Sequence, residues 1–254
     1  MVSLTDQAIA ILLLTLRVVP AFGFSPPFTL LRVPAIVRIL LSIALSAWMA
    51  AANPQHTWQS DFRQNGIAAA AIGELVLGIG LALALQFAFA ALLTVGRSLD
   101  IQAGFGLAVL VDPTTRGQMP LVGTLFAYAA AAIFFAGDGL ADMLAIWAAS
   151  IEAVPLGTAA VTGDLGGLLG YLSAVFVIAC GLGGSIMVAL FLADMAIAFM
   201  SRTLPQMNVL LLGFQVKALV TLALLPAATG LSGALFVRLL RTALEAAPHL
   251  VTAR

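Results

Sequence analysis

The chain has 254 residues, of which 62% are hydrophobic and only 9% are charged, and its mean hydropathy is +1.12. A soluble domain would carry roughly a quarter charged residues, so this composition predicts an integral membrane protein with the lipid bilayer as its environment. The 11 basic and 11 acidic residues cancel, which excludes a basic surface for nucleic acid and a polybasic arm for anionic lipid headgroups. The single cysteine, Cys180, excludes an intrachain disulfide and a cysteine zinc site.

The apolar segments predict an all-α, polytopic fold. They lie at residues 8–24, 35–52, 67–95, 121–136, 168–200 and 209–236, and a simple span needs about 20 residues. The first is expected to be a retained span, because no basic region precedes it and no small-residue cleavage site follows it. Ser3 and Asp6 can cap this helix, while Pro20 and Gly23 end or bend it.

Roughly six hydrophobic helical segments follow, some of them broken or hairpin-like. The segment at residues 168–200 is unusually long and contains Gly181, Gly183 and Gly184. It is compatible with one tilted helix or with two shorter helices bent at the glycines. No repeat of fixed period is visible, so residues 1–254 are expected to form a single membrane domain. Glycine becomes more frequent in the last third, with the change near residues 152–167.

The distribution of charge indicates an orientation only in part. Lys and Arg are absent from residues 137–167, which puts this acidic segment outside the cell and the side of Arg97 inside. With six spans, the basic tail that carries Arg238, Arg241 and Arg254 would also lie outside, against the same rule. A hairpin at residues 168–200 would remove the conflict, as would helices that do not all cross the bilayer.

The stretch at residues 96–120 interrupts the apolar pattern with polar residues and helix breakers. We expect a loop inside the membrane protein. Because lipid cannot satisfy free N–H and C=O groups, such a loop must be buried in protein or line a watery cavity. This stretch is therefore the first candidate for a pore, gate or site. Its candidate residues are Asp100, Gln102, Gly104, Phe105, Asp112, Pro113, Arg116, Met119 and Pro120.

Polar residues also lie within or against the apolar segments, namely Glu74, Gln86, Asp194 and Lys217. In a membrane such a group is costly and by default faces the interior of a bundle or a cavity. A proton relay is one interpretation. The residues are scattered rather than spaced along one helix face, which favours structural polar contacts between helices or subunits. A transporter site would instead show broken helices in matching halves with clustered ligands.

Patterns typical of catalysis or of metal and cofactor binding are missing from the sequence. His56 and His249 have no second ligand at metal-binding spacing. No serine lies in a G-x-S-x-G setting, and no paired carboxylates form a recognisable acid-base motif. The glycine run at residues 181–185 lacks the lysine of a phosphate-binding loop. We expect no enzyme activity and no cofactor. Gly166 and Gly170 instead suit close helix packing.

The most specific stretch is SRTLPQMNVLLLGFQVK at residues 201–217. Pro205 cannot donate a backbone hydrogen bond, and Gln206 and Asn208 add amide groups, so side-chain hydrogen bonds can fix this turn. We interpret the stretch as an assembly motif. Its residues are Arg202, Pro205, Gln206, Met207, Asn208, Gly213, Phe214 and Lys217.

The core R-x-x-P-Q-M-N-V, followed by G-F-x-x-K, resembles the signature of the FliR family of flagellar biosynthesis proteins, which are related to the T component of type III secretion export gates. The stretch at residues 96–120 agrees, and so does a block near the N-terminus. That block contains Arg17, Val18, Val19, Pro20, Ala21, Phe22, Pro26, Pro27, Pro34 and Arg38. Gln215 replaces an expected proline and Leu140 a common histidine, which leaves the choice between a flagellar and a virulence-type system open.

The resemblance implies a non-enzymatic membrane subunit of the flagellar type III export gate, through which unfolded flagellar proteins leave the cell. It implies one copy in a helical assembly with FliP and FliQ, next to FlhB and FlhA. It also implies that residues 1–152 pack like FliP, that residues 168–254 pack like FliQ, and that the stretch at 96–120 contributes a plug across the closed pore.

Three other interpretations remain open at this point. One is the equivalent subunit of an injectisome. Another is a secondary transporter with Glu74, Asp194 and Lys217 as a coupled ion site. An intramembrane enzyme is the third, and no nucleophile or metal constellation supports it.

Overall fold

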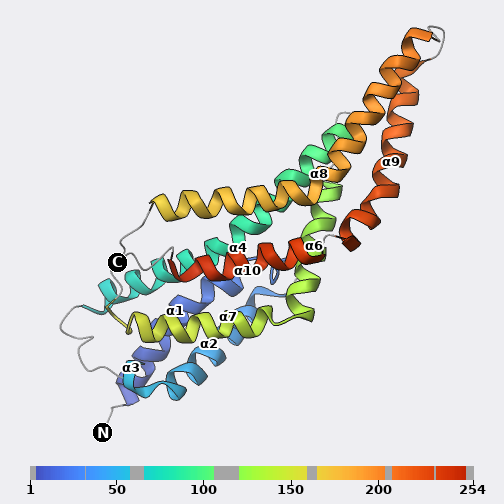
Figure 1. Cartoon of the computed structure of the whole chain (residues 1–254). Helices are drawn as coiled ribbons and strands as arrows, with labels where there is room; N and C mark the ends of the chain where they lie inside the picture. Colours follow the sequence, from blue (N-terminus) through green and yellow to red (C-terminus); the bar gives the residue numbers. More distant parts are fainter. Residues whose placement is uncertain are drawn as a thin grey trace.

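The computed structural model describes residues 4–31, 33–57, 66–105, 120–158, 165–203, 208–231 and 233–249, and it has only helices as regular elements in this part of the chain. Figure 1 shows their arrangement. The helices are α1 (Leu4–Phe24), α2 (Ala35–Ala52), α3 (Pro54–Thr57), α4 (Ile67–Ala103), α6 (Leu121–Ala136), α7 (Gly139–Ala153), α8 (Leu165–Thr203), α9 (Val209–Leu231) and α10 (Gly233–His249). The predicted all-α fold is confirmed.

Five of the described helices, α1, α2, α4, α8 and α9, are long and apolar enough to cross a membrane. A sixth span is added if the bent pair α6–α7 crosses as one unit. The prediction of a polytopic membrane protein with about six spans is therefore confirmed. The expected end of the first span near Gly23 is found at Phe24, with Pro20 inside the helix; Ser3 lies outside the described residues.

Helix α4 is the element around which the bundle is built. It has 37 residues, so it is roughly 55 Å long at 1.5 Å per residue. Helices α1, α6, α8 and α10 all pack against it. Core side chains come from each neighbour, as in the edge-to-face contact of Phe126 with Phe236, whose ring centroids are 6.0 Å apart. The long central helix α4 thus positions both the first and the last described helix, α1 and α10.

Glycines on α4 let its neighbours approach closely. A Cβ atom at Gly78 would lie 2.4 Å from the carbonyl oxygen of Arg17 on α1. One at Gly96 would lie 2.0 Å from Cα of Gly123 on α6. Any side chain at these positions would push the helices apart, so glycine here permits backbone-to-backbone packing.

The acidic segment at residues 137–167, whose predicted position outside the cell stays a prediction, was not among the predicted apolar segments but contains a helix. Helix α7 bends away from α6 by 73°. Its buried side chains, Met143, Trp147 and Ile151, recur every four residues and form one face, while Asp142 and Glu152 are exposed. These charges hid the 3.6-residue period from the hydropathy pattern.

Helices α8 and α9 form a hairpin that extends beyond the other helices (Figure 1). Of the two alternatives for residues 168–200, the structure has the single helix, and it runs for 39 residues through all the glycines. Figure 1 shows α8 changing direction partway along its length. Little of the hairpin is covered, since 33% of the apolar stretch of α8 and 17% of that of α9 are buried.

The last apolar segment ends earlier than expected. Residues 209–236 are not one helix, because α9 stops at Leu231 and α10 begins at Gly233. Phe236, Leu239 and Ala243 are fully buried, and α10 packs on α4, α6, α7 and α8. The described part of the expected basic tail is therefore an amphipathic helix that packs on the core, with Arg238 and Arg241 on its exposed face. Arg254 lies outside the described residues.

Candidate functional site

The first part of the stretch at residues 96–120 is helical, which corrects the expectation of a loop from Gly96 onward. Helix α4 continues through Asp100 and Gln102 and ends at Ala103. Gly104 then adopts φ of +88°, a left-handed conformation that favours glycine. The N–H of Phe105 donates to the carbonyl oxygen of Asp100 at 2.9 Å. The sequence placed the break too early because a single glycine does not stop a well-packed helix.

Asp100 joins the end of α4 to the beginning of α6. Its Oδ1 accepts a hydrogen bond from the backbone N–H of Val122 at 3.2 Å, and the residue is 6% exposed. The two helices are already in contact through Gly96 and Gly123. Pro120 immediately precedes α6 and its side chain makes no capping hydrogen bond. Asp112, Pro113, Arg116 and Met119 lie outside the described residues.

The two most specific sequence motifs meet at this junction. A Cβ atom at Gly104 would lie 2.6 Å from Cδ1 of Phe214, so the phenylalanine ring of α9 covers the glycine that ends α4. Sequence reasoning selected both residues without indicating that they touch. The end of α4, the beginning of α6 and the first turns of α9 therefore form one candidate site.

Within the assembly motif, Asn208 caps α9. Its Oδ1 accepts the N–H of Leu211 at 3.2 Å, and its carbonyl oxygen accepts the N–H of Leu212 at 3.1 Å. This geometry satisfies N–H groups that a helix terminus leaves free. Arg202 lies exposed in the last turn of α8. Pro205, Gln206 and Met207 lie outside the described residues.

Lys217 and Asp194 connect the two helices of the hairpin. The Lys217 Nζ lies 2.5 Å from Oδ1 of Asp194, and their side chains are 20% and 42% exposed. Gly213 packs near Ile197 on the same pair of helices. The ion pair thus aligns α9 against α8, and each charge has its counterion.

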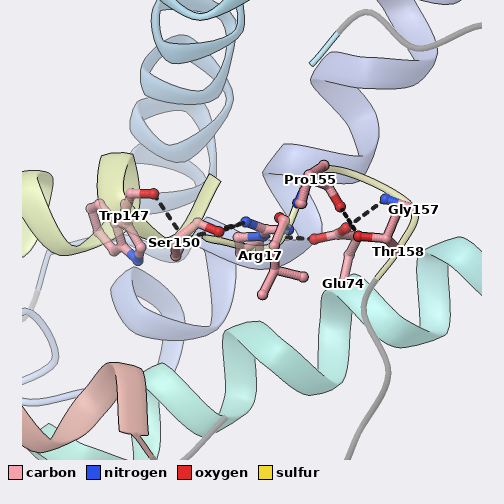
Figure 2. A network of polar contacts seen from close by, with 8 residues as sticks. Arg17, Glu74, Trp147, Ser150, Pro155, Gly157 and Thr158 are labelled. Atoms are coloured by element: carbon pink, nitrogen blue, oxygen red, sulfur yellow. Dashed lines mark hydrogen bonds and ion pairs between the residues drawn. The ribbon is translucent and has the colours of Figure 1, made fainter. Parts of the chain in front are cut away.

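Glu74 pairs with a residue that sequence reasoning did not select as a site. Figure 2 shows the Arg17 Nε directed at Oε2 of Glu74, at 2.6 Å, with neither side chain exposed. The same guanidinium donates to the carbonyl oxygens of Ser150 and Val154, each at 2.9 Å. Glu74 Oε1 accepts the N–H of Gly157 at 2.9 Å. The sequence offered one signal for this role of Arg17, namely that it is an arginine inside the first apolar span.

Arg38, in the same sequence block as Arg17, also caps a helix. Its Nη1 donates to the carbonyl oxygens of Phe22 and Gly23 at 3.3 and 2.5 Å. These carbonyls belong to the last residues of α1, where a positive group also complements the helix dipole. Both arginines of this block therefore anchor helix ends.

The intramembrane polar residues do not converge. Glu74 is bound within the N-terminal helices, Asp194 and Lys217 are bound to each other on the hairpin, and Gln86 is exposed. Among the described residues, no group of three or more His, Cys, Asp or Glu side chains is arranged to hold a metal ion. This arrangement stabilises helix packing and offers no clustered ion site in the described part of the chain.

Known proteins are similar to this chain over most of its length. It is 28% identical to the flagellar biosynthetic protein FliR of Bacillus subtilis (strain 168) over 235 residues, which cover 88% of this chain and 87% of that protein. FliR of Escherichia coli (strain K12) is 25% identical over 158 residues, 62% of this chain and 60% of that protein. The Yop proteins translocation protein T of Yersinia pestis is 28% identical over 191 residues, 74% of this chain and 72% of that protein.

The family match is the broadest of these similarities. Residues 8–243 match the family described as bacterial export proteins, family 1. That range begins within α1 and ends within α10, so it includes every element of the junction and the hairpin. The chain belongs to the bacterial export proteins, family 1.

Proposed function

We propose that this protein is a non-enzymatic subunit of the flagellar type III protein export gate, multi-pass in the bacterial inner membrane at the flagellar basal body. The observation that carries the proposal is similarity to proteins named FliR along most of the chain. The fold is compatible with it, since five of the described helices are long and apolar enough to cross a membrane and two ion pairs join helices to one another. Such a subunit forms part of the channel for unfolded flagellar proteins.

The equivalent subunit of an injectisome is the second candidate. The Yop proteins translocation protein T matches as closely in identity, 28%, but over 74% of this chain. FliR of Bacillus subtilis matches over 88%. The longer match favours the flagellar assignment.

A secondary transporter with Glu74, Asp194 and Lys217 at one ion site is disfavoured by the geometry. Glu74 uses both carboxylate oxygens for Arg17 and Gly157, whereas Asp194 and Lys217 neutralise each other on another pair of helices. A coupled site requires its ligands to converge.

The uncovered hairpin supports a hetero-oligomeric assembly. The partly exposed Asp194 and Lys217 would be costly against lipid. A Cβ atom added at Gly170 or Gly184 on α8 would meet no atom within 4 Å beyond the neighbouring backbone of its own helix. Both features suit close contact with other protein chains. We infer that the partners are FliP and FliQ, with FlhB and FlhA nearby, and that residues 1–152 pack like FliP and residues 168–254 like FliQ.

We also propose that residues 112–119 occlude the resting channel. These residues lie outside the described part of the chain, but both flanks are fixed. Gly104 ends α4 under Phe214, and α6 begins at Leu121 beside Asp100. A segment with fixed ends at the helix junction is well placed to close a conduit made by several subunits.

Purification from membranes tests the assignment. The tagged full-length chain, expressed at its natural level and extracted in mild detergent, should bring FliP and FliQ with it in mass spectrometry. A strain that lacks FliP and FliQ should give little folded protein. A monodisperse, stable monomer from that strain, together with binding or movement of a small solute, would contradict the gate assignment and favour a transporter.

A further inference from the structure

Asp100 bonds to the chain on both sides of the α4–α6 junction. Its backbone carbonyl oxygen accepts the N–H of Phe105 at 2.9 Å, after the end of α4. Its side-chain Oδ1 accepts the N–H of Val122 at 3.2 Å, in the first turn of α6. One residue therefore holds the last residues before and the first residues after the intervening stretch.

The first turn of α6 needs this acceptor. A helix N-terminus leaves its first N–H groups without partners, and a side chain at the N-cap position usually accepts one of them. The N-cap residue of α6 is Pro120, whose side chain makes no such bond. Val122 is fully buried, so water cannot compensate if its N–H group loses its acceptor. Asp100 supplies from α4 the cap that α6 lacks.

The close packing of α4 on α6 restricts which side chain can reach Val122 from position 100. The contact of Gly96 with Gly123, one turn below Asp100, fixes the distance between the two helices. At this distance the short aspartate reaches Val122 while staying 6% exposed. Its second oxygen, Oδ2, is buried and has no hydrogen-bond partner among the described groups. The bond to Val122 uses one oxygen acceptor, and the observed geometry does not require the second oxygen.

We propose that Asp100 is a positioning residue: although it belongs to α4, its side chain takes the place of an N-cap for α6. It does so by accepting a hydrogen bond at Oδ1, and no proton transfer is involved. It fixes the beginning of α6 relative to the end of α4. The expected effect of Asp100 on channel closure rests on the proposed function, because only in that function do the residues that flank 106–119 affect ion leakage. Its effect on the α6 first turn is independent of that proposal.

The experiment compares Asp100→Asn with Asp100→Ala in the full assembled complex. Asparagine keeps an acceptor oxygen at the same reach but has no carboxyl group that can take up or release a proton, whereas alanine removes the acceptor. Hydrogen exchange measured by mass spectrometry on a peptide spanning residues 120–126 should rise on the order of tenfold in Asp100→Ala. It should stay within about twofold of wild type in Asp100→Asn. Asp142→Ala, at an exposed carboxylate in the first turn of α7, is the matched control and should leave this peptide unchanged.

Ion conductance of membranes containing the complex is the second measurement. Asp100→Ala should raise it severalfold and Asp100→Asn should not. If Asp100→Ala prevents assembly, normal assembly and protection in Asp100→Asn still support the cap. An asparagine variant that fails like alanine in exchange, conductance or assembly overturns the inference, because the charge would then be required.

The two measurements also separate this inference from the proposed function. Faster exchange in Asp100→Ala without added conductance supports the cap and counts against closure by residues 112–119. Unchanged exchange in Asp100→Ala contradicts the cap, whether or not shortening the 112–119 stretch opens the channel.

Discussion

Arg17 and Glu74 form an ion pair inside the core, with 2.6 Å between Nε and Oε2 and neither side chain exposed. Arg17→Ala would leave the carboxylate buried without a counterion and the carbonyl oxygens of Ser150 and Val154 without their donor. Removal of one partner from a buried pair costs about 3–5 kcal/mol. We expect loss of most folded protein, measured as the yield and thermal stability of the detergent-extracted complex.

The two members of this pair do not contribute equally, because Arg17 also donates hydrogen bonds to the carbonyl oxygens of Ser150 and Val154. Glu74→Gln keeps one acceptor for Arg17 and should cost less than Arg17→Ala. The charge exchange Arg17→Glu with Glu74→Arg restores opposite charges but directs a carboxylate at the carbonyl oxygen of Ser150. It should therefore remain unstable. Recovery to wild-type stability in the exchanged pair would show that the ion pair alone matters and that α7 is not held by Arg17.

Gly96→Ala should disrupt the contact of α4 with α6. The new methyl group would lie 2.0 Å from Cα of Gly123, and backbone cannot move aside as a flexible side chain can. Overpacking typically costs 1–3 kcal/mol. We expect faster proteolysis of the chain in membranes. Gly233→Ala, at the start of α10 and away from the hairpin, is the control, because its added methyl group would meet no atom within 4 Å beyond the neighbouring backbone of its own helix; equal resistance of both variants would refute close packing at Gly96.

The sequence predicted the helical membrane fold because long apolar segments have few structural alternatives. It also selected Gly104 and Phe214 separately, but their contact depends on how α9 folds back onto α4. Helix α7 was not predicted because the charges of Asp142 and Glu152 interrupt the apolar pattern of its sequence. Both residues are exposed, whereas Trp147 is buried. The role of Arg17 depends on Ser150 and Val154, more than 130 residues away. Local patterns do not specify such distant partners.

Asn208→Ala should reduce the amount of assembled gate. The variant loses the side-chain cap of α9, a change worth about 1 kcal/mol, at the turn where the hairpin reverses. Asn208→Asp keeps the oxygen and should restore assembly, which can be followed by native gel electrophoresis of the extracted complex. Thr203→Ala, an exposed hydroxyl near the same turn, should have little effect. If Asn208→Ala assembled fully and export alone stopped, the residue would act in transport itself.

Neutralising Asp194 and Lys217 together should be tolerated better than neutralising either one. Each single change leaves the other charge without its partner at 2.5 Å on the hairpin, and an unpaired charge in a membrane assembly is costly. We expect Lys217→Met with Asp194→Leu to recover several times more complex than Lys217→Met alone. Motility of cells that carry each variant gives the export readout. A double variant that assembles fully but abolishes export would support a coupled ion site instead.

Deletion of residues 114–118 should raise ion conductance while the complex still assembles. The deletion shortens the proposed plug and leaves α4, α6 and the Asp100 cap intact. Closure matters because a conduit wide enough for an unfolded chain also passes ions, and each charge that crosses gains about 2.3 kcal/mol per 100 mV of membrane potential. Conductance can be measured in planar bilayers containing the purified complex, and co-purified FliP and FliQ report assembly.

The matched control replaces residues 114–118 with a flexible stretch of the same length, which separates loss of length from loss of side chains. If length closes the channel, this replacement should conduct less than the deletion. If the side chains themselves seal it, both variants should leak equally. A deletion that assembles normally and conducts no more than wild type would assign closure to the partner subunits, and residues 112–119 would then serve only to connect α4 with α6.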